Sequence, residues 1–292
     1  MNRPSRRSSS QKSFSAASII GKIVAANIQR QQASNEGHFM RIGTWNVEYA
    51  RGSRNSDRLN LLKSKDADIL VLTETHSDLD LSKTHVALMS EKRPKLENQK
   101  VHDGSTWVTI WSRFPLVRKI NVPDSRRMVA AVFDTSIGLL ALAGVVLPWH
   151  DDIGDEPGSQ IPPLWDEHRR VLRDQMKVLM TTMSAESGGC RRVIAGDFNS
   201  HQAFPYPFSY PYPPKEDLRR ELAELLSGES FSCHTGHEKV PEPLSPGGLP
   251  QMLIDHVYTD FGPAFRVETW SGFDGKSPRL SDHPGVLVDL PD

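Results

Sequence analysis

Polar residues at the ends of apolar strands are the sequence feature that most restricts the fold of this chain. Five predicted strands end in an acid, an amide or an imidazole, and such residues directly precede the last strand. Burying so many polar groups beside separate apolar strands would cost free energy unless they served one purpose. These groups are Asn46, Glu74, His150, the pair Asp197 and Asn199, Asp255, and the pair Asp282 and His283. We therefore expect the strand ends to meet at one site.

The remaining pattern predicts many strands and few helices. Strands are expected at 40–48, 67–73, 84–89, 106–112, 128–134, 138–147, 192–195, 252–258, 264–270 and 285–290, and helices at 57–65, 164–183 and 215–226. A simple alternation of strand and helix does not fit this order. The pattern predicts an α/β protein in which two sheets stack on each other with helices outside.

The chain is long enough for one large domain that needs no disulfide or metal to fold. Residues 1–35 contain Arg and Lys but no Asp or Glu, so the remainder is acidic although the whole carries a net charge of −1. We predict a disordered or weakly helical basic leader at 1–38 and one folded domain at 39–292. The leader could be a targeting segment, or Met40 could be the true start.

The compartment is predicted from what the composition excludes. Cys190 and Cys233 lie far apart in the sequence, which excludes a disulfide framework and a Cys-rich zinc site. The chain has no continuous apolar run long enough for a membrane span and no signal-peptide core. We expect a cytoplasmic protein without stable membrane insertion.

Carboxylate and amide oxygens are the ligands that Mg²⁺ or Mn²⁺ prefers, so the polar strand ends predict a metal site. Each residue alone also has an ordinary interpretation: Asn46 and Asn199 as turn formers, Glu74 as a solvated acid, Asp197 as an Asx-turn residue. His150 is one of 11 histidines. Only the joint occurrence of these residues favours function.

The ordered set resembles the endonuclease/exonuclease/phosphatase superfamily over roughly residues 40–290. Its motifs are WN at 45–46, TE at 73–74, His150 after a strand, GDFN at 196–199, IDHV at 254–257 and SDH at 281–283. The resemblance implies a four-layer α-β-β-α sandwich of two mainly antiparallel sheets. It also implies hydrolysis of a phosphate ester by metal-assisted attack of water.

The resemblance assigns a role to each motif residue. Asn46, Glu74 and Asp282 would hold Mg²⁺ or Mn²⁺, and Asp197 would orient or deprotonate the attacking water. Asn199 would hold that water or a phosphate oxygen. His283, oriented by Asp255, and His150 would donate to phosphate oxygens. We also predict that Arg113, in a segment that resembles the family's Ser-Arg-aromatic-Pro stretch, and Arg126 contact the substrate. Arg113 could instead have a structural role, and Arg126 could lie at a solvated strand end.

Departures from the family pattern restrict the substrate. The segment Thr73-Glu74-Thr75-His76 lacks the Gln and Lys that flank the metal Glu in abasic-site endonucleases, which does not favour that activity. Asp151 and Asp152 follow His150, and this acidic setting would repel a long polyanion. The Pro-aromatic loop 203–214 could stack on a base, line a pocket or be a rigid structural loop.

We therefore predict a metal-dependent phosphoesterase, either a nuclease or a phosphatase. Its predicted partner is a phosphate ester, with single-stranded nucleic acid or a small phosphoester favoured over duplex DNA. Two alternatives remain: a catalytically inactive binding module on the same fold, and an unrelated α/β protein in which the motifs occur by chance.

Overall fold

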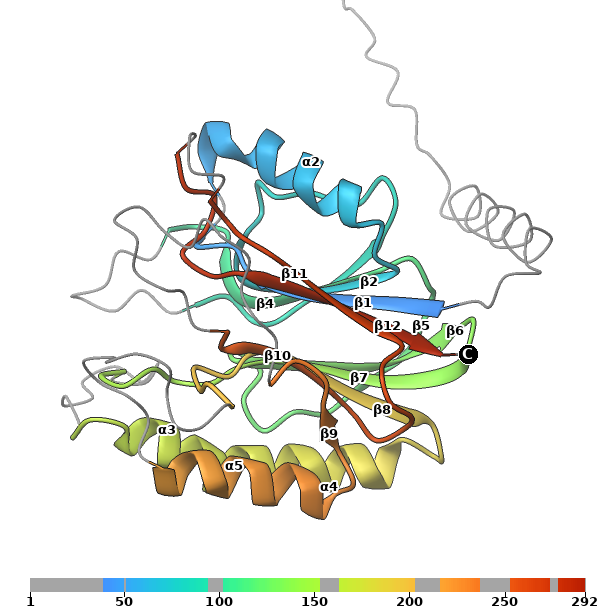
Figure 1. Ribbon diagram of the computed structural model, residues 1–292, viewed down its shortest axis with the longest axis vertical. Coiled ribbons are helices and arrows are strands. Elements are labelled where there is room, and N and C mark those ends of the chain that lie inside the picture. Colours follow the sequence, from blue (N-terminus) through green and yellow to red (C-terminus); the bar gives the residue numbers. More distant parts are fainter. Residues whose placement is uncertain are drawn as a thin grey trace, which may run out of the picture. The chain divides into compact units, whose positions relative to one another are not determined.

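Two stacked sheets, each of six strands, form the centre of the computed structural model, with helices on both outer faces (Figure 1). The structure describes residues 39–49, 51–93, 102–152, 163–202, 216–236, 253–273 and 278–291. The predicted four-layer sandwich is confirmed. The predicted leader and the Pro-aromatic loop lie outside the described residues.

The first sheet has the strand order β11-β12-β1-β2-β4-β3. Its strands are β1 (Phe39–Asn46), β2 (Ile69–His76), β3 (Val86–Met89), β4 (Ser105–Ser112), β11 (Arg266–Trp270) and β12 (Gly285–Pro291). In this sheet β1 and β2 run parallel, whereas the other neighbouring strands run antiparallel.

The second sheet has the order β5-β6-β7-β8-β10-β9. Its strands are β5 (Leu116–Ile120), β6 (Met128–Thr135), β7 (Gly138–Val146), β8 (Arg191–Asp197), β9 (Ser232–Cys233) and β10 (Asp255–Thr259). Here β7 and β8 form the parallel pair.

Three apolar clusters hold the four layers together. Side chains such as Ile42, Val71 and Leu142 are buried between the sheets. The first sheet is covered by α2 (Asn55–Lys65), which follows the short helix η1 (Gly52–Arg54), and the second by α5 (Glu216–Gly228) and a long helical segment (Figure 1). That segment consists of α3 (Asp166–Arg170), the π-helix η2 (Val171–Met176) and α4 (Lys177–Glu186). None of the helices in the described ranges is long and apolar enough to cross a membrane.

The prediction that Asp255 follows the end of a strand is wrong. Asp255 is the first residue of β10, and it pairs with Asp197, the last residue of β8, because the two strands are antiparallel. The carboxyl ends of the parallel strands β7 and β8 thereby meet the amino end of β10. The polar residues still lie at one end of the sandwich, but Asp255 reaches it from the start of a strand and not from a strand end, as predicted.

Candidate active site

A hydrogen bond across the two sheets lies at the centre of the candidate site. Asn46, at the end of β1, donates from Nδ2 to Asp197 Oδ2, at the end of β8, over 3.0 Å. Both side chains are about 1% exposed. Because each residue is the last of its strand, the strands fix the two side chains against each other on a rigid support.

His283 and Asp255 form the second pair. His283 Nδ1 donates to Asp255 Oδ2 over 2.6 Å, and the same nitrogen is 4.0 Å from Asp197 Oδ2. Burial opposes the charged imidazole, but the negative charges of Asp255 and Asp197 raise the pKa of His283 well above its usual value. The Nδ1 contact fixes the orientation of the ring and leaves Nε2 for another partner.

Both carboxylate oxygens of Asp197 accept hydrogen bonds. Its Oδ1 accepts from the backbone N–H of Asn199 over 2.8 Å. Burial, followed by the charge of Asp255, raises the pKa of Asp197 to about 7. Asn199 has a left-handed backbone with φ of 46°, and its Nδ2 donates to Leu147 O over 2.8 Å. The hydrogen bond from the Asn199 amide therefore connects the turn after β8 with the end of β7.

Glu74 is an irregular residue inside β2. Its φ is 49°, although Thr73 and Thr75 on either side keep their pairing with Val108 and Thr106. Strict alternation would turn Glu74 to the face occupied by Leu72, which packs with the α2 layer. The left-handed backbone breaks this alternation and allows the carboxylate to reach the Asn46 side chain.

Burial raises the pKa of Glu74, and the nearby carboxylate of Asp282 adds to this effect. The charge of His283 and the hydrogen bond from Asn46 oppose it. Glu74 thus lies within electrostatic reach of both His283 and Asp282, which precede β12.

The segment that carries Asp282 and His283 is fastened to β1. Ser281 Oγ donates to Asn46 O over 2.5 Å and accepts from His283 N over 3.0 Å. Trp45 Nε1 donates to His283 O over 3.0 Å. Asp282 itself is exposed.

The donor groups fit a hard divalent cation. Ligand atoms of Asp197, Asp255 and His283 all lie within 4.8 Å of one another. Asp255 Oδ1 is buried and has no hydrogen-bond partner in the described part of the chain, and burial leaves Glu74 with an unfavourable charge. A bound cation would relieve whichever of these groups it contacts, and the available oxygens are the ligand type of Mg²⁺ and Mn²⁺.

Two predicted residues lie near this edge without a described contact to Asp197. His150 Nε2 is 3.7 Å from Asp151 Oδ1, and its ring centroid is 6.0 Å from that of Trp165. The backbone N–H of Arg126 donates to Asp124 Oδ1 over 3.0 Å in the turn before β6. Their predicted contacts with substrate remain predictions.

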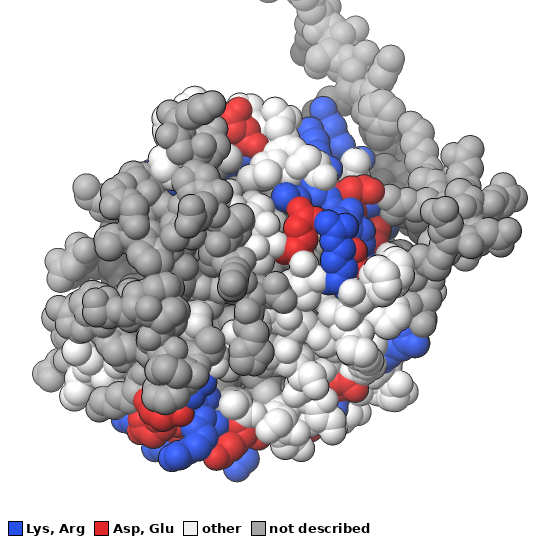
Figure 2. Space-filling view, in the orientation of Figure 1, with Lys and Arg blue, Asp and Glu red and all other residues white. Residues whose placement is uncertain are grey.

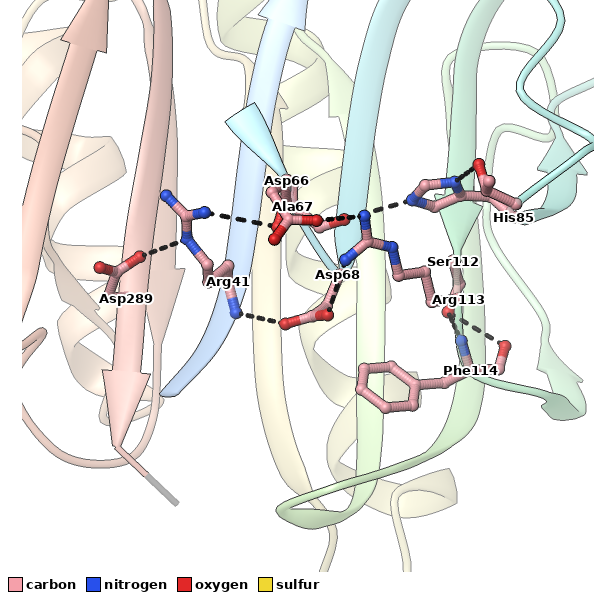
Figure 3. Close-up of polar contacts among 10 residues, drawn as sticks. Arg41, Asp66, Ala67, Asp68, His85, Ser112, Arg113, Phe114 and Asp289 are labelled. Atoms are coloured by element: carbon pink, nitrogen blue, oxygen red, sulfur yellow. Dashed lines mark hydrogen bonds and ion pairs between the residues drawn. The ribbon is translucent and has the colours of Figure 1, made fainter. Parts of the chain in front are cut away.

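Arg113 lies at the other end of the strands of the first sheet, away from Asn46 and Glu74. Its guanidinium contacts Asp66 Oδ1 at 2.6 Å and Asp68 Oδ1 at 3.3 Å, directly before β2 begins (Figure 3). Glu74 is six residues further along, roughly 20 Å at the usual rise of a strand. The structure does not bring Arg113 to the site, and we leave it out of the proposed substrate contacts.

A group of arginines and aromatic rings near Glu74 was not predicted, because no sequence motif marks it. The Arg93 guanidinium carbon lies 3.6 Å from the centroid of the Trp107 ring, and Arg93 also donates to the Tyr49 hydroxyl. Burial raises the pKa of Glu74, and the charge of Arg93 opposes this rise. Arg127 forms a buried ion pair with Asp152 at 2.9 Å. Asp152 therefore balances a buried cation, which corrects its interpretation as part of a repelling acidic loop.

Comparisons with known proteins agree with this geometry. The model of the Endonuclease/Exonuclease/phosphatase family matches residues 43–283. Among curated proteins, none matches this sequence.

Solved structures share the fold at low sequence identity. The 3′ phosphatase NExo from Neisseria, bound to a product DNA hairpin, is 19% identical with a TM-score of 0.62, covering 87% of this chain and 100% of its own. An AP endonuclease from Archaeoglobus fulgidus is 16% identical with a TM-score of 0.59, covering 87% and 99%. Sphingomyelinase C from Streptomyces griseocarneus is 11% identical with a TM-score of 0.56, covering 86% and 98%. Since the family model spans most of the chain and includes every motif of the candidate site, the protein belongs to the Endonuclease/Exonuclease/phosphatase family.

Proposed function

We propose that this chain is a divalent-cation-dependent phosphoesterase that hydrolyses a phosphate ester by direct attack of water. The observation that carries the proposal is the buried Asp197, hydrogen-bonded to Asn46 and adjoining the Asp255–His283 pair. A carboxylate with a raised pKa beside an oriented imidazole can move protons near neutral pH. Members of this family hydrolyse phosphoester bonds, which supports the same chemistry here.

Each side chain then has a defined task. Asp197 accepts a proton from the attacking water, because its pKa of about 7 lies near the working pH. His283, kept charged by Asp255 and Asp197, donates from Nε2 to a phosphate oxygen. Asn199 contributes its remaining amide oxygen to the water. His150 and Arg126 approach the substrate from the second sheet.

Asn46, Glu74 and Asp282 would hold the cation. Bound there, Mg²⁺ or Mn²⁺ would neutralise charge that develops on the phosphate and on the leaving oxygen.

For the substrate we propose a single-stranded nucleic acid or a small phosphoester. The structures that share the fold include a 3′ phosphatase bound to DNA and a sphingomyelinase. The fold alone therefore does not determine the substrate. Where Figure 2 shows described residues, acidic and basic side chains lie together in mixed groups. Tight, salt-dependent binding along a duplex would need a basic stripe. We also propose a cytoplasmic location, since both cysteines are free thiols.

The test is hydrolysis of bis-p-nitrophenyl phosphate, p-nitrophenyl phosphate, single-stranded DNA and supercoiled plasmid, with Mg²⁺, Mn²⁺ or EDTA. Asp197→Asn and His283→Gln should each lower kcat by ~10²-fold or more on the preferred substrate. Asp260→Asn is the matched control, because Asp260 follows the far end of β10 and binds Arg192.

Cation-dependent turnover that both site variants lose and the control keeps would support the proposal. A folded protein that turns over none of these substrates with either cation, yet binds one of them, would instead indicate an inactive binding module.

A further inference from the structure

Arg58 is a buried cation outside the candidate site. It lies on the inner face of α2 and is 1% exposed. Its Nε donates to Leu280 O over 2.9 Å, and its Nη1 donates to Asn55 Oδ1 over 3.1 Å. Burial, followed by the nearby charge of Arg54, lowers the pKa of Arg58 to about 10. An apolar side chain of similar volume often stabilises a core better than a buried charge, so stability alone explains Arg58 poorly.

The carbonyl that Arg58 binds begins the segment 280–283, which ends in Asp282 and His283. One turn earlier on the same side, Arg54 donates to the preceding carbonyl, Arg279 O. The guanidinium of Arg279 in turn contacts Glu48 Oε1 at 2.7 Å. Two arginines at the start of the α2 region therefore hold consecutive carbonyls just before the proposed catalytic residues.

The other side of the segment 280–283 is fixed as well. Leu280 N donates to Gly272 O over 2.7 Å, and a Cβ atom at Gly272 would lie only 2.5 Å from Ser281 O. Ser281 and His283 bind the end of β1 through Asn46 O and the Trp45 indole. The segment thus has three supports, and Arg58 provides the one from the helical layer.

We propose that Arg58 is a positioning residue that fixes the Leu280 carbonyl. By this contact it holds His283 in its hydrogen bond to Asp255, and it keeps Asp282 near Glu74. The inference rests on the proposed function and extends it to the helix that covers the first sheet. A displacement of about 1 Å at a reacting group can lower turnover ~10²-fold, so a remote support of this kind affects kcat.

The experiment compares Arg58→Met, Arg58→Lys and the control Arg41→Met. Arg41 is an arginine of the first sheet that forms an ion pair with Asp289 at 3.1 Å, and it lies near the start of β1, away from the segment 280–283 (Figure 3). Three quantities are measured for each: kcat and KM on bis-p-nitrophenyl phosphate, the free energy of unfolding in urea, and the proton resonance of His283 Nδ1–H. The short bond to Asp255 should move this resonance far downfield.

We expect Arg58→Met to lower kcat about 10–100-fold with little change in KM and to shift or abolish the His283 resonance. Arg58→Lys, which restores one donor, should fall between Arg58→Met and the wild type. Arg41→Met should change only the free energy of unfolding. Should Arg58→Met not fold, Arg58→Lys supplies the same comparison.

An unchanged His283 resonance in a folded Arg58 variant would overturn the inference, and so would a loss of stability with kcat preserved. The resonance is measured without substrate. If the wild type turns over nothing, the proposed function fails, while the positioning role of Arg58 is still decided by the resonance.

Discussion

Backbone strain gathers around the candidate site. Four of the seven described non-glycine residues with positive φ are Glu48, Tyr49, Glu74 and Asn199. Each lies in or directly after a strand that carries a proposed site residue. Left-handed backbone is costly for most side chains and persists where the surrounding contacts impose it. At Glu74 and Asn199 this conformation redirects a polar side chain that regular strand geometry would turn elsewhere.

Asn199 allows strain and chemistry to be separated. Asn199→Gly removes the side chain, and glycine adopts positive φ without strain. Asn199→Ala also removes the side chain, but alanine in the left-handed conformation costs conformational free energy. Both variants should lose turnover to a similar extent, and the alanine variant should be less stable by about 1 kcal/mol. Urea denaturation and kcat measured side by side check this. Equal stability of the two variants would contradict the strain argument.

At the scale of elements, the two parallel strand pairs decide where the site lies. They bring the carboxyl ends of β1 and β2 to one edge of the first sheet, and those of β7 and β8 to one edge of the second. The opposite edge of the first sheet is held by ion pairs, among them Arg41 with Asp289 and Arg113 with Asp66 and Asp68 (Figure 3). The candidate site and these ion pairs of Arg41 and Arg113 therefore lie at opposite ends of the strands of the first sheet.

Arg113→Met tests this division. The substitution leaves Asp68, which is mostly buried, without its cation, so we expect the free energy of unfolding to fall by about 1–3 kcal/mol. Because Arg113 lies far from Asn46 and Glu74, kcat and KM should stay at wild-type values. A raised KM with unchanged stability would return Arg113 to the substrate site that the sequence motif predicted for it.

The buried strands were predicted well, because they contain continuously apolar runs such as 69–72. The strands β5 and β9 were missed for physical reasons. The segment β5 is half exposed, with Val117 at 52%, and it contains Arg118 and Lys119, so it shows no apolar face. The strand β9 has two residues, too few for any alternation. The start of β10 was misplaced because the apolar residues before Asp255 extend the strand pattern beyond its hydrogen-bonded part.

At the scale of the whole molecule, the candidate site was predictable to the extent that its residues lie in short motifs. Asp197 and Asn199 share one tetrapeptide, and Asp282 and His283 are adjacent. Arg58 was not predictable, because its partner Leu280 is 222 residues away and nothing in the helix pattern marks it as buried. The same holds for Arg93 and Trp107, whose contact depends on how two sheet segments meet.

The boundary between leader and domain remains a prediction that truncation can test. Phe39 opens β1 and stacks on Phe265, with ring centroids 4.3 Å apart. A chain that begins at His38 should keep the full free energy of unfolding and the full turnover. A chain that begins at Met40 should lose about 1 kcal/mol, the usual contribution of such a ring pair. Loss of turnover on removing residues 1–37 would show that the leader takes part in the activity.

Acid should destabilise the whole molecule through His168, which lies beneath the end of β7. Its Nδ1 contacts Pro148 O at 2.7 Å, and burial lowers the pKa of His168 to about 4. The unfolded chain, with a histidine pKa near ~6.5, binds the proton first, so stability is complete above that pH and is lost as the pH falls toward 4.

The loss should approach roughly 3 kcal/mol from this residue alone, and urea denaturation between pH 7 and pH 4.5 measures it. His168→Asn keeps a donor for Pro148 O but cannot take up the proton. The variant should therefore be less stable at pH 7, because it leaves a cavity, yet show a smaller decrease on acidification. If wild type and variant lost the same free energy between the two pH values, other groups would account for the acid sensitivity and His168 would not.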